Sequence, residues 1–278
     1  MVDEIYDNKK RIGELRDYLK SFGRFLVAFS GGVDSTLLLY MAREVLGKEA
    51  ISVTVKSVVL HDFDVDRAKE EAERAGVEHI VIEFSPLEIE GVRGNRPDRC
   101  YQCKKTLFGL IKKEAKRLGI DLVVEGTNAD DLSDFRPGIK ALSELGIKSP
   151  FLDLGMKKEE IREISREIGI SGFERSPTTC LLTRFPYGED ITIEKIERVK
   201  KSEIFLKDLG FKTFRVRSHG DLARIEVDSG ELPLFFDESL SDKVLRGLKG
   251  AGFSYVTIDL EGYRTGSMNE CLTELDIK

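Results

Sequence analysis

The sequence predicts an α/β protein, in which a parallel sheet flanked by helices is followed by a small α+β domain. Short apolar runs alternate with amphipathic helical patterns up to residue 170, which is typical of βαβ units. An irregular stretch rich in Pro, Gly and Thr then occupies 171–190, and the order of elements changes after it. We therefore expect two domains, at 1–190 and 191–278, in this chain of 278 residues.

Each element of this prediction has its own pattern. The first domain begins with an amphipathic helical pattern at 5–22. Apolar runs predict buried strands at 24–29, 50–55, 79–84 and 121–126. Apolar residues at helical spacing predict helices at 37–47, 66–76, 98–118 and 157–169. In the second domain we expect helices at 192–209 and 238–250, a pair of short strands within 214–228, and a strand at 254–258.

Composition narrows the classes of function. Hydrophobic residues make up 41% of the chain, and no apolar run approaches the roughly 20 residues that span a bilayer. Residues 1–23 lack the apolar core of a signal peptide, so we expect a cytoplasmic protein without a membrane partner. The net charge of −6 argues against a large nucleic-acid footprint, although a few Arg and Lys residues could still bind a small anion.

The sequence SGGVDS at 30–35 stands between a predicted strand and a predicted helix. A turn at this place directs main-chain N–H groups and the positive end of the helix toward one point, which suits phosphate. Ser30 and Ser35 supply hydroxyl groups, and Gly31 and Gly32 permit a positive φ. Asp34 would hold Mg²⁺ against the phosphates. The alternative is a plain strand-to-helix turn; the motif is neither a Walker loop nor a dinucleotide-binding loop.

Three cysteines form a second candidate site. Cys100 and Cys103 belong to CYQC near the start of a long predicted helix, so both sulfurs share one face of its first turn. The helix N-terminus and neighbouring basic residues favour thiolates there. This pair could bind zinc with two other ligands, act as a redox pair or be structural. Cys180, in the irregular stretch, favours a shared zinc or iron–sulfur site, and we expect no role for Cys271.

Arginines in the second domain form a third set. Arg215 and Arg217 alternate along one predicted strand and share a face, and Arg is suited to bidentate binding of phosphate or carboxylate. Further candidates for the same anion are Arg184, Arg224 and Arg264. Glu203 and Glu226 would bind a divalent cation or pair with these arginines. A solvated strand face is the alternative interpretation.

The turn SGGVDS, directly after the first strand, resembles the PP-loop of the ATP pyrophosphatase superfamily, whose fold is adenine nucleotide alpha-hydrolase-like. The resemblance implies cleavage of ATP to AMP and pyrophosphate through adenylation of a substrate oxygen. It implies that 53–57 contact the adenosine and that the turn GTNADD at 126–131 faces the nucleotide. The nucleotide-binding residues that it implies are Ser30, Gly31, Gly32, Asp34, Ser35, Thr36, Val55, Gly126 and Thr127. A helix cap made by Asn128 is the alternative for the second turn.

The motifs SGGVDST, RCYQCKK, CLLTRFPYGE, FRVRSHGDLARIEV and GYRTGSMNE occur in this order. Together they resemble the LarE-type ATP-dependent sacrificial sulfur transferases, which help to build the nickel-pincer nucleotide cofactor. The resemblance implies that ATP and Mg²⁺ activate a carboxylate of pyridinium-3,5-biscarboxylate mononucleotide, which then becomes a thiocarboxylate. Catalytic roles would belong to Asp34, Cys100, Cys103 and Cys180.

Within that family the three cysteines match the members that hold a [4Fe–4S] cluster rather than those that give up the sulfur of one cysteine. A small-molecule nucleotide and sulfide or another sulfur donor would then be the partners, and we expect a homo-oligomer. Arg184, Arg215, Arg217 and Arg264 would bind the substrate, and Glu203 and Glu226 a cation. The alternatives are a tRNA thiolation enzyme, another PP-loop ligase or amidotransferase with a structural zinc, and a nucleotide-binding adaptor.

Overall fold

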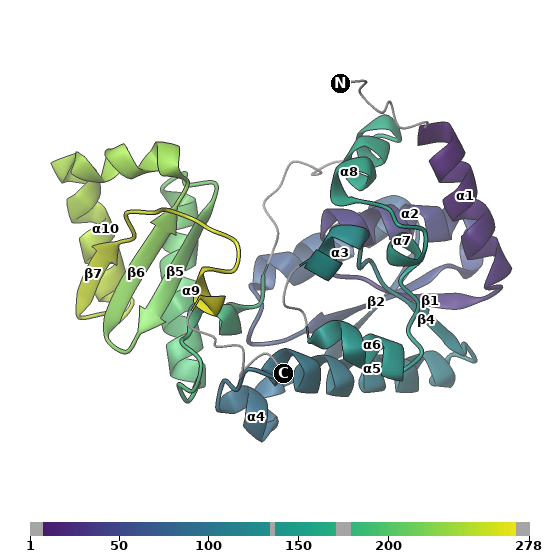
Figure 1. Ribbon diagram of the computed structural model, residues 1–278, viewed down its shortest axis with the longest axis horizontal. Coiled ribbons are helices and arrows are strands. Elements are labelled where there is room, and N and C mark those ends of the chain that lie inside the picture. The colour runs from purple at the N-terminus through teal and green to yellow at the C-terminus, as the bar shows by residue number, and fades with distance from the viewer. Residues whose placement is uncertain (1–7, 134–136, 171–178, 271–278) are drawn as a thin grey trace. The chain divides into compact units, whose positions relative to one another are not determined.

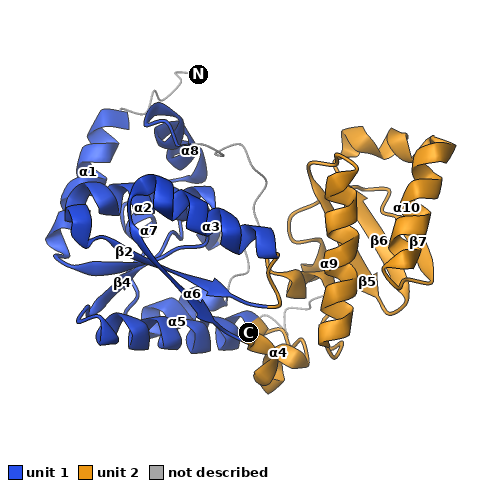
Figure 2. Cartoon of the chain, turned by 180° about the vertical axis from the view of Figure 1, so that it is seen from behind, with its two compact units in different colours: residues 1–57, 62–84, 100–178 blue, residues 58–61, 85–99, 179–278 orange. Residues whose placement is uncertain are grey.

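The computed structural model describes residues 8–133, 137–170 and 179–270 and divides the chain into two compact units (Figure 2). The first unit comprises residues 1–57, 62–84 and 100–178, and the second comprises 58–61, 85–99 and 179–278. Both units are therefore discontinuous in the sequence. The domain boundary expected at residue 190 stays a prediction. No helix among the described residues is both long and apolar enough to cross a membrane.

The first unit is built on a parallel sheet of four strands in the order β3-β2-β1-β4. Figure 1 labels β1, β2 and β4 of this sheet and the helices around it. The strands are β1 (Phe25–Ala28), β2 (Ile51–Lys56), β3 (Glu78–Glu83) and β4 (Leu122–Val124). Its helices are α1 (Asn8–Ser21), α2 (Val33–Leu46), α3 (Asp62–Ala75), α5 (Arg99–Arg117), α6 (Gly138–Glu144), α7 (Pro150–Asp153) and α8 (Lys158–Glu167). The short 3₁₀ segments are η1 (Gly47–Glu49) and η3 (Ala129–Ser133).

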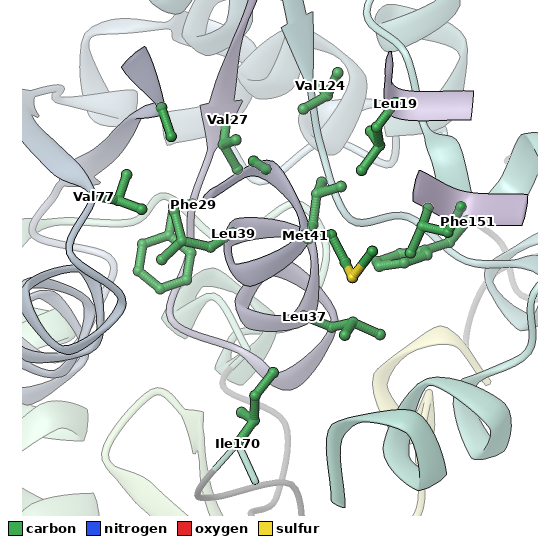
Figure 3. Packing of buried hydrophobic residues seen from close by; sticks show 14 of the residues in the cluster. Leu19, Val27, Phe29, Leu37, Leu39, Met41, Val77, Val124, Phe151 and Ile170 are labelled. Atoms are coloured by element: carbon green, nitrogen blue, oxygen red, sulfur yellow. The ribbon is translucent and has the colours of Figure 1, made fainter. Parts of the chain in front are cut away.

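Side-chain alternation along β1 explains why helices cover both faces of this sheet. Phe25, Val27 and Phe29 point into a core shared with α1, α2, α3, α7 and α8 (Figure 3). Leu26 points the other way, into a core shared with α5 and α6. Because successive residues of a strand face opposite sides, a run that is apolar throughout must be buried on both. The expected α/β class with a parallel sheet flanked by helices is confirmed.

The second unit holds a mixed sheet of three strands in the order β5-β6-β7. β5 (Phe214–His219) pairs antiparallel with β6 (Leu222–Val227), and β6 pairs parallel with β7 (Tyr255–Ile258). The helices of this unit are α4 (Glu90–Arg93), α9 (Ile193–Asp208) and α10 (Glu238–Gly250). Short 3₁₀ segments lie at η2 (Pro86–Glu88), η4 (Leu181–Arg184), η5 (Ser229–Phe236) and η6 (Ser267–Asn269). The small α+β region that we expected at the end of the chain is confirmed.

Element boundaries differ from the sequence predictions mainly at helix starts. The helix expected from residue 37 begins at Val33, because Gly32 has extended backbone angles and serves as the residue before the first turn. This places Asp34 and Ser35 inside the helix. The short helices α4, α6 and α7 were not predicted, because each has only four to seven residues and shows too few turns for a periodic pattern.

Candidate functional site

The turn after β1 has the geometry expected of an anion-binding loop. Gly31 has a φ of +73°, and a Cβ there would lie 3.3 Å from the Cβ of Ala68 on α3. Both the positive φ and the close helix require glycine. The expectation of a positive φ is wrong for Gly32, whose φ is −78°. Among the described residues other than its chain neighbours, only the hydroxyl of Ser30, at 3.4 Å, lies within 4 Å of a Cβ built on Gly32.

Hydroxyl groups brace the turn from within. The Oγ atoms of Ser30 and Ser35 lie 3.0 Å apart. The hydroxyls of Ser35 and Thr36 donate to the carbonyl of Gly32 over 3.0 and 2.8 Å. The first N–H groups of α2 have no carbonyl partner within the helix, and Gly32 has no side chain to cap them. The rigid turn therefore presents unpaired donors and the helix dipole to an incoming phosphate.

Asp34 lies in the first turn of α2, beside this group of donors. Its Oδ2 is 3.2 Å from the Nζ of Lys158, at the start of α8. Burial raises the pKa of Asp34 above its usual value, against the opposing effect of the Lys158 charge. Its Oδ1 is buried and makes no hydrogen bond to any residue that the structure describes. A buried carboxylate oxygen without a donor fits a hard cation such as Mg²⁺, so the residues present suit that ion.

The turn after β4 packs directly against the start of α2. A Cβ on Gly126 would lie 3.0 Å from the main-chain nitrogen of Ser35 and 3.2 Å from the main-chain carbon of Asp34. Only glycine allows this approach. The turn is fixed by the buried carboxylate of Glu125, which accepts hydrogen bonds from the N–H of Thr127 at 3.0 Å and from its hydroxyl at 2.7 Å. The two predicted nucleotide-facing turns are therefore in contact.

Asn128 and Val55 belong to the two segments that were expected to lie near the nucleotide. The side chain of Asn128 accepts from the N–H of Asp130 at 3.0 Å, so the capping role considered for this turn is confirmed. Val55 is half-buried on β2 and packs against the core on the α5 side of the sheet. Its expected contact with adenosine stays a prediction.

Strand order explains why these turns meet. From β1 the chain moves outward to β2 and β3 and then returns to place β4 on the other side of β1. The carboxyl ends of β1 and β4 thus flank the point at which the chain reverses direction. Ligands of open α/β sheets bind at such a point, outside the carboxyl ends of the strands.

Lys158 and Arg162 are two candidate functional residues that the sequence reasoning missed. Residues 157–169 were predicted as a helix without a role at the site. Lys158 pairs with Asp34, and the charge of Arg162, one helical turn later, also acts on the Asp34 carboxylate. A signal was present, because two basic side chains at i and i+4 on a helix share one face.

The cysteines are distributed between the two units. Cys100 is exposed and Cys103 half-buried, and both lie in the first turn of α5, as expected. Cys180 is half-buried and directly precedes η4 in the second unit. Within the described residues, no group of three or more His, Cys, Asp or Glu side chains is arranged to hold a metal ion. The meeting of three cysteines stays a prediction, and Cys271 lies outside the described residues.

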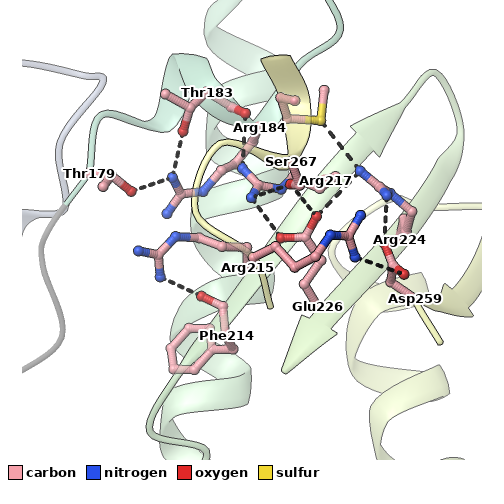
Figure 4. A network of polar contacts seen from close by, with 12 residues as sticks. Thr179, Thr183, Arg184, Phe214, Arg215, Arg217, Arg224, Glu226, Asp259 and Ser267 are labelled. Carbon is pink, nitrogen blue, oxygen red and sulfur yellow. Dashed lines mark hydrogen bonds and ion pairs between the residues drawn. The ribbon is translucent and has the colours of Figure 1, made fainter. Parts of the chain in front are cut away.

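The Cys180 segment is tied to the arginine cluster of the second unit. The Nη1 of Arg184 donates to the hydroxyls of Thr179 and Thr183 at 2.7 and 2.8 Å (Figure 4). Its Nε and Nη2 donate to Glu203 at 2.7 and 3.0 Å. The guanidinium predicted to bind substrate is thus occupied by protein acceptors. Arg184 holds the chain on both sides of Cys180.

The predicted common face of Arg215 and Arg217 exists, but it is not solvated. These two residues are 7% and 4% exposed. Burial, and secondly the charge of Arg184, lower the pKa of Arg215. The Arg215 guanidinium lies 5.0 Å from the centre of the Tyr263 ring, and Arg217 binds Glu226 at 2.6 Å. Buried guanidinium groups are suited to an anion, and the binding of substrate by Arg215 and Arg217 stays a prediction.

The two glutamates are surrounded by donors. Besides Arg184, Glu203 accepts from the N–H of Val216 at 3.0 Å and lies 3.0 Å from the Nε2 of His61. Burial acts to raise the pKa of Glu203, but the Arg184 charge and the His61 hydrogen bond outweigh it and hold that pKa below the usual range. Glu226 contacts Arg217, Arg224 and Ser267. Such neighbours disfavour a divalent cation, and the cation site stays a prediction.

Arg264 and Arg224 complete the set of predicted arginines. Arg264 is partly exposed, with a side chain that is 28% accessible, and pairs with Glu261 at 2.7 Å. Arg224 binds Asp259 as well as Glu226. Acidic partners therefore surround Arg264, whereas Arg215 and Arg217 lie together on one strand.

Comparison with known proteins agrees with this geometry. The sequence profile of the PP-loop domain family matches residues 5–135. The chain is 38% identical over 266 residues to an uncharacterised protein of Synechocystis, covering 96% of this chain and 99% of the relative. It is 36% identical over 260 residues to the pyridinium-3,5-bisthiocarboxylic acid mononucleotide synthase of Lactiplantibacillus plantarum, covering 93% and 94%. An uncharacterised protein of Methanocaldococcus jannaschii is 34% identical over 259 residues, covering 92% and 98%.

Proposed function

The chain belongs to the PP-loop family that includes pyridinium-3,5-bisthiocarboxylic acid mononucleotide synthase, and from that premise we propose that it is an ATP-dependent sulfur transferase. Its substrate is pyridinium-3,5-biscarboxylate mononucleotide, one carboxylate of which it converts to a thiocarboxylate. The observation that carries the proposal is the contact between the SGGVDS turn and Gly126 at the carboxyl ends of β1 and β4.

The first chemical step is adenylation. A carboxylate oxygen of the substrate attacks the α-phosphorus of ATP, and the bond from that phosphorus to the bridging oxygen of the β-phosphate breaks. The leaving pyrophosphate carries the charge that the open N–H groups of α2 stabilise. Asp34 would hold Mg²⁺, which neutralises the phosphates. The product of this step is an acyl-adenylate, a mixed anhydride that is reactive toward a sulfur nucleophile.

The second step replaces AMP by sulfur at the acyl carbon, so that a C–S bond forms as the C–O bond to AMP breaks. Cys100, Cys103 and Cys180 have the soft thiolate chemistry that suits an iron–sulfur cluster, and the first two share one face of a helix N-terminus. When bound, a [4Fe–4S] cluster would supply a soft sulfide nucleophile. Arg184 holds the segment around Cys180 through Thr179 and Thr183.

The second unit would bind the phosphate of the substrate. Arg215 and Arg217 are buried on one strand, where a guanidinium pair can meet a phosphate bidentately. Binding an anion there offsets the mutual repulsion of these guanidinium groups. This assignment predicts that Arg217→Ala raises the KM for the mononucleotide more than it raises the KM for ATP.

Pyrophosphate release tests the proposal. The anaerobically purified protein is incubated with ATP, Mg²⁺ and the biscarboxylate mononucleotide, and we expect pyrophosphate that depends on the mononucleotide, with a thiocarboxylate detected by mass spectrometry. Iron and acid-labile sulfide in stoichiometric amounts support the cluster, whereas stoichiometric zinc contradicts it. Pyrophosphate release that requires tRNA instead of the mononucleotide would refute the substrate assignment.

A further inference from the structure

The start of α8 is fixed in front of the PP-loop by two contacts to the turn after β4. The main-chain N–H of Lys158 donates to the Oδ2 of Asp130 at 2.8 Å, and the N–H of Ala129 donates to the carbonyl of Met156 at 2.9 Å. The first turn of α8 is therefore anchored through its main chain. The side chain of Lys158 can move without disturbing these bonds.

That side chain neutralises the carboxylate in the PP-loop. The Nζ of Lys158 lies 3.2 Å from the Oδ2 of Asp34, and the two side chains are 30% and 19% exposed. Asp34 is also the carboxylate proposed to hold Mg²⁺. Mg²⁺ on the free Oδ1 would lie close to the ammonium on Oδ2, and the repulsion between the two cations weakens the hold of Lys158 on Asp34.

A second basic side chain stands next to this ion pair. Arg162 is four residues after Lys158, so both lie on one face of α8. The Nε of Arg162 is buried and makes no hydrogen bond within the described part of the chain, while its charge acts on Asp34. A buried guanidinium N–H without an acceptor is costly, and an anion would satisfy it.

From these contacts we infer that Lys158 is an exchangeable counterion, which pairs with Asp34 in the metal-free protein and is displaced when Mg²⁺ binds there. The released ammonium then turns to the phosphates of ATP, where Arg162 provides the second positive charge. Lysine suits this exchange because its ammonium is a point charge on a flexible stem. The inference rests on the proposed function, because it assumes ATP with Mg²⁺ as the ligand of this turn.

The exchange couples metal and nucleotide binding. Without nucleotide, Mg²⁺ must compete with Lys158 for Asp34, so the metal binds weakly. With nucleotide, the displaced ammonium gains a phosphate partner, so the same exchange becomes favourable. Each ligand therefore strengthens the binding of the other. A residue that served only to bind phosphate would not weaken the binding of Mg²⁺ alone.

Calorimetric titrations of the full chain separate these possibilities. Lys158→Met retains the main-chain bond to Asp130, and we expect it to bind Mg²⁺ without nucleotide about tenfold more tightly than the wild type. The same variant should bind the Mg²⁺ complex of α,β-methylene-ATP about tenfold more weakly. Lys158→Arg keeps the charge and should stay near the wild-type Mg²⁺ affinity. Lys157→Met is the matched control on the exposed neighbour and should change neither affinity.

Opposite signs for the two affinities of Lys158→Met support the exchange. Unchanged or weaker binding of Mg²⁺ alone would overturn it, whatever happens to the nucleotide. If Lys158→Met does not give the wild-type circular dichroism spectrum, Lys158→Gln takes its place with the same expected signs. A wild-type protein that binds Mg²⁺ but not the nucleotide analogue would contradict the proposed function instead, and the metal titration of the variants would still decide the exchange.

Discussion

Gly126→Ala tests whether the contact between the two nucleotide-facing turns matters for catalysis. The new methyl group would lie 3.0 Å from the nitrogen of Ser35 and 3.2 Å from two further main-chain atoms of Asp34 and Ser35. Main-chain atoms of a helix cannot rotate away as a side chain can. To restore an ordinary contact of 3.4 Å, the two turns must separate by roughly 0.4 Å.

This displacement predicts two measurable effects. Overpacking of a rigid contact costs about 1–3 kcal/mol of unfolding free energy, so the Tm should fall by several degrees. Catalysis should suffer separately, since a misplacement of about 1 Å in an active site costs roughly 100-fold in rate. For the smaller shift here we expect pyrophosphate release to slow about tenfold. The rate is measured well below the Tm of the variant, so that unfolding does not contribute.

Gly109→Ala is the matched control. Gly109 lies inside α5, and outside the backbone of that helix a Cβ there would meet no atom of the described residues within 4 Å. Alanine in a helix interior is favoured over glycine by roughly 0.5–1 kcal/mol, so this variant should be slightly stabilised and fully active. Wild-type pyrophosphate release by Gly126→Ala would show that the contact does not position the nucleotide. A rate loss of equal size in Gly109→Ala would show that the assay reports general damage.

Four further predictions follow from single residues. Asp34→Ala should reduce pyrophosphate release by about 100- to 1000-fold and leave the iron and sulfide content unchanged; loss of both would contradict the separation of roles. Cys180→Ala should do the reverse, with pyrophosphate release retained and thiocarboxylate absent by mass spectrometry. Burial lowers the pKa of His79, so its neutral form stabilises the fold above about pH 6.5 and that contribution is lost as the pH falls. Urea unfolding of His79→Asn should depend less on pH between 7.5 and 5, and an unchanged dependence refutes this. Arg184→Met leaves the buried Glu203 carboxylate without its arginine partner and should lower the free energy of unfolding by about 3–5 kcal/mol. Thermal unfolding measures this loss, and a loss below about 1 kcal/mol would refute the prediction.

Local patterns predicted much of the fold. The fully apolar run at β1 required burial on both faces, and the strand pair around His219 showed its turn residues directly. Alternation also placed Arg215 and Arg217 on one face of a strand. Alternation cannot say which face is covered, however, and the burial of these arginines depends on packing against parts of the chain that are distant in sequence. The solvated face considered for them was therefore wrong.

The candidate ATP site shows where prediction from the sequence stops. Two of its turns follow strands β1 and β4, and a turn after a buried strand can be recognised from local residue types. The spacing of Lys158 and Arg162 places both on one face of α8, but it cannot say what that face meets, because Lys158 contacts Asp34 across 124 positions of sequence. Their encounter depends on β4 returning beside β1, which fixes where the chain between Gly126 and α8 can run. Patterns of two to four residues predict which side chains can bind phosphate, whereas the strand order decides which of them share one phosphate.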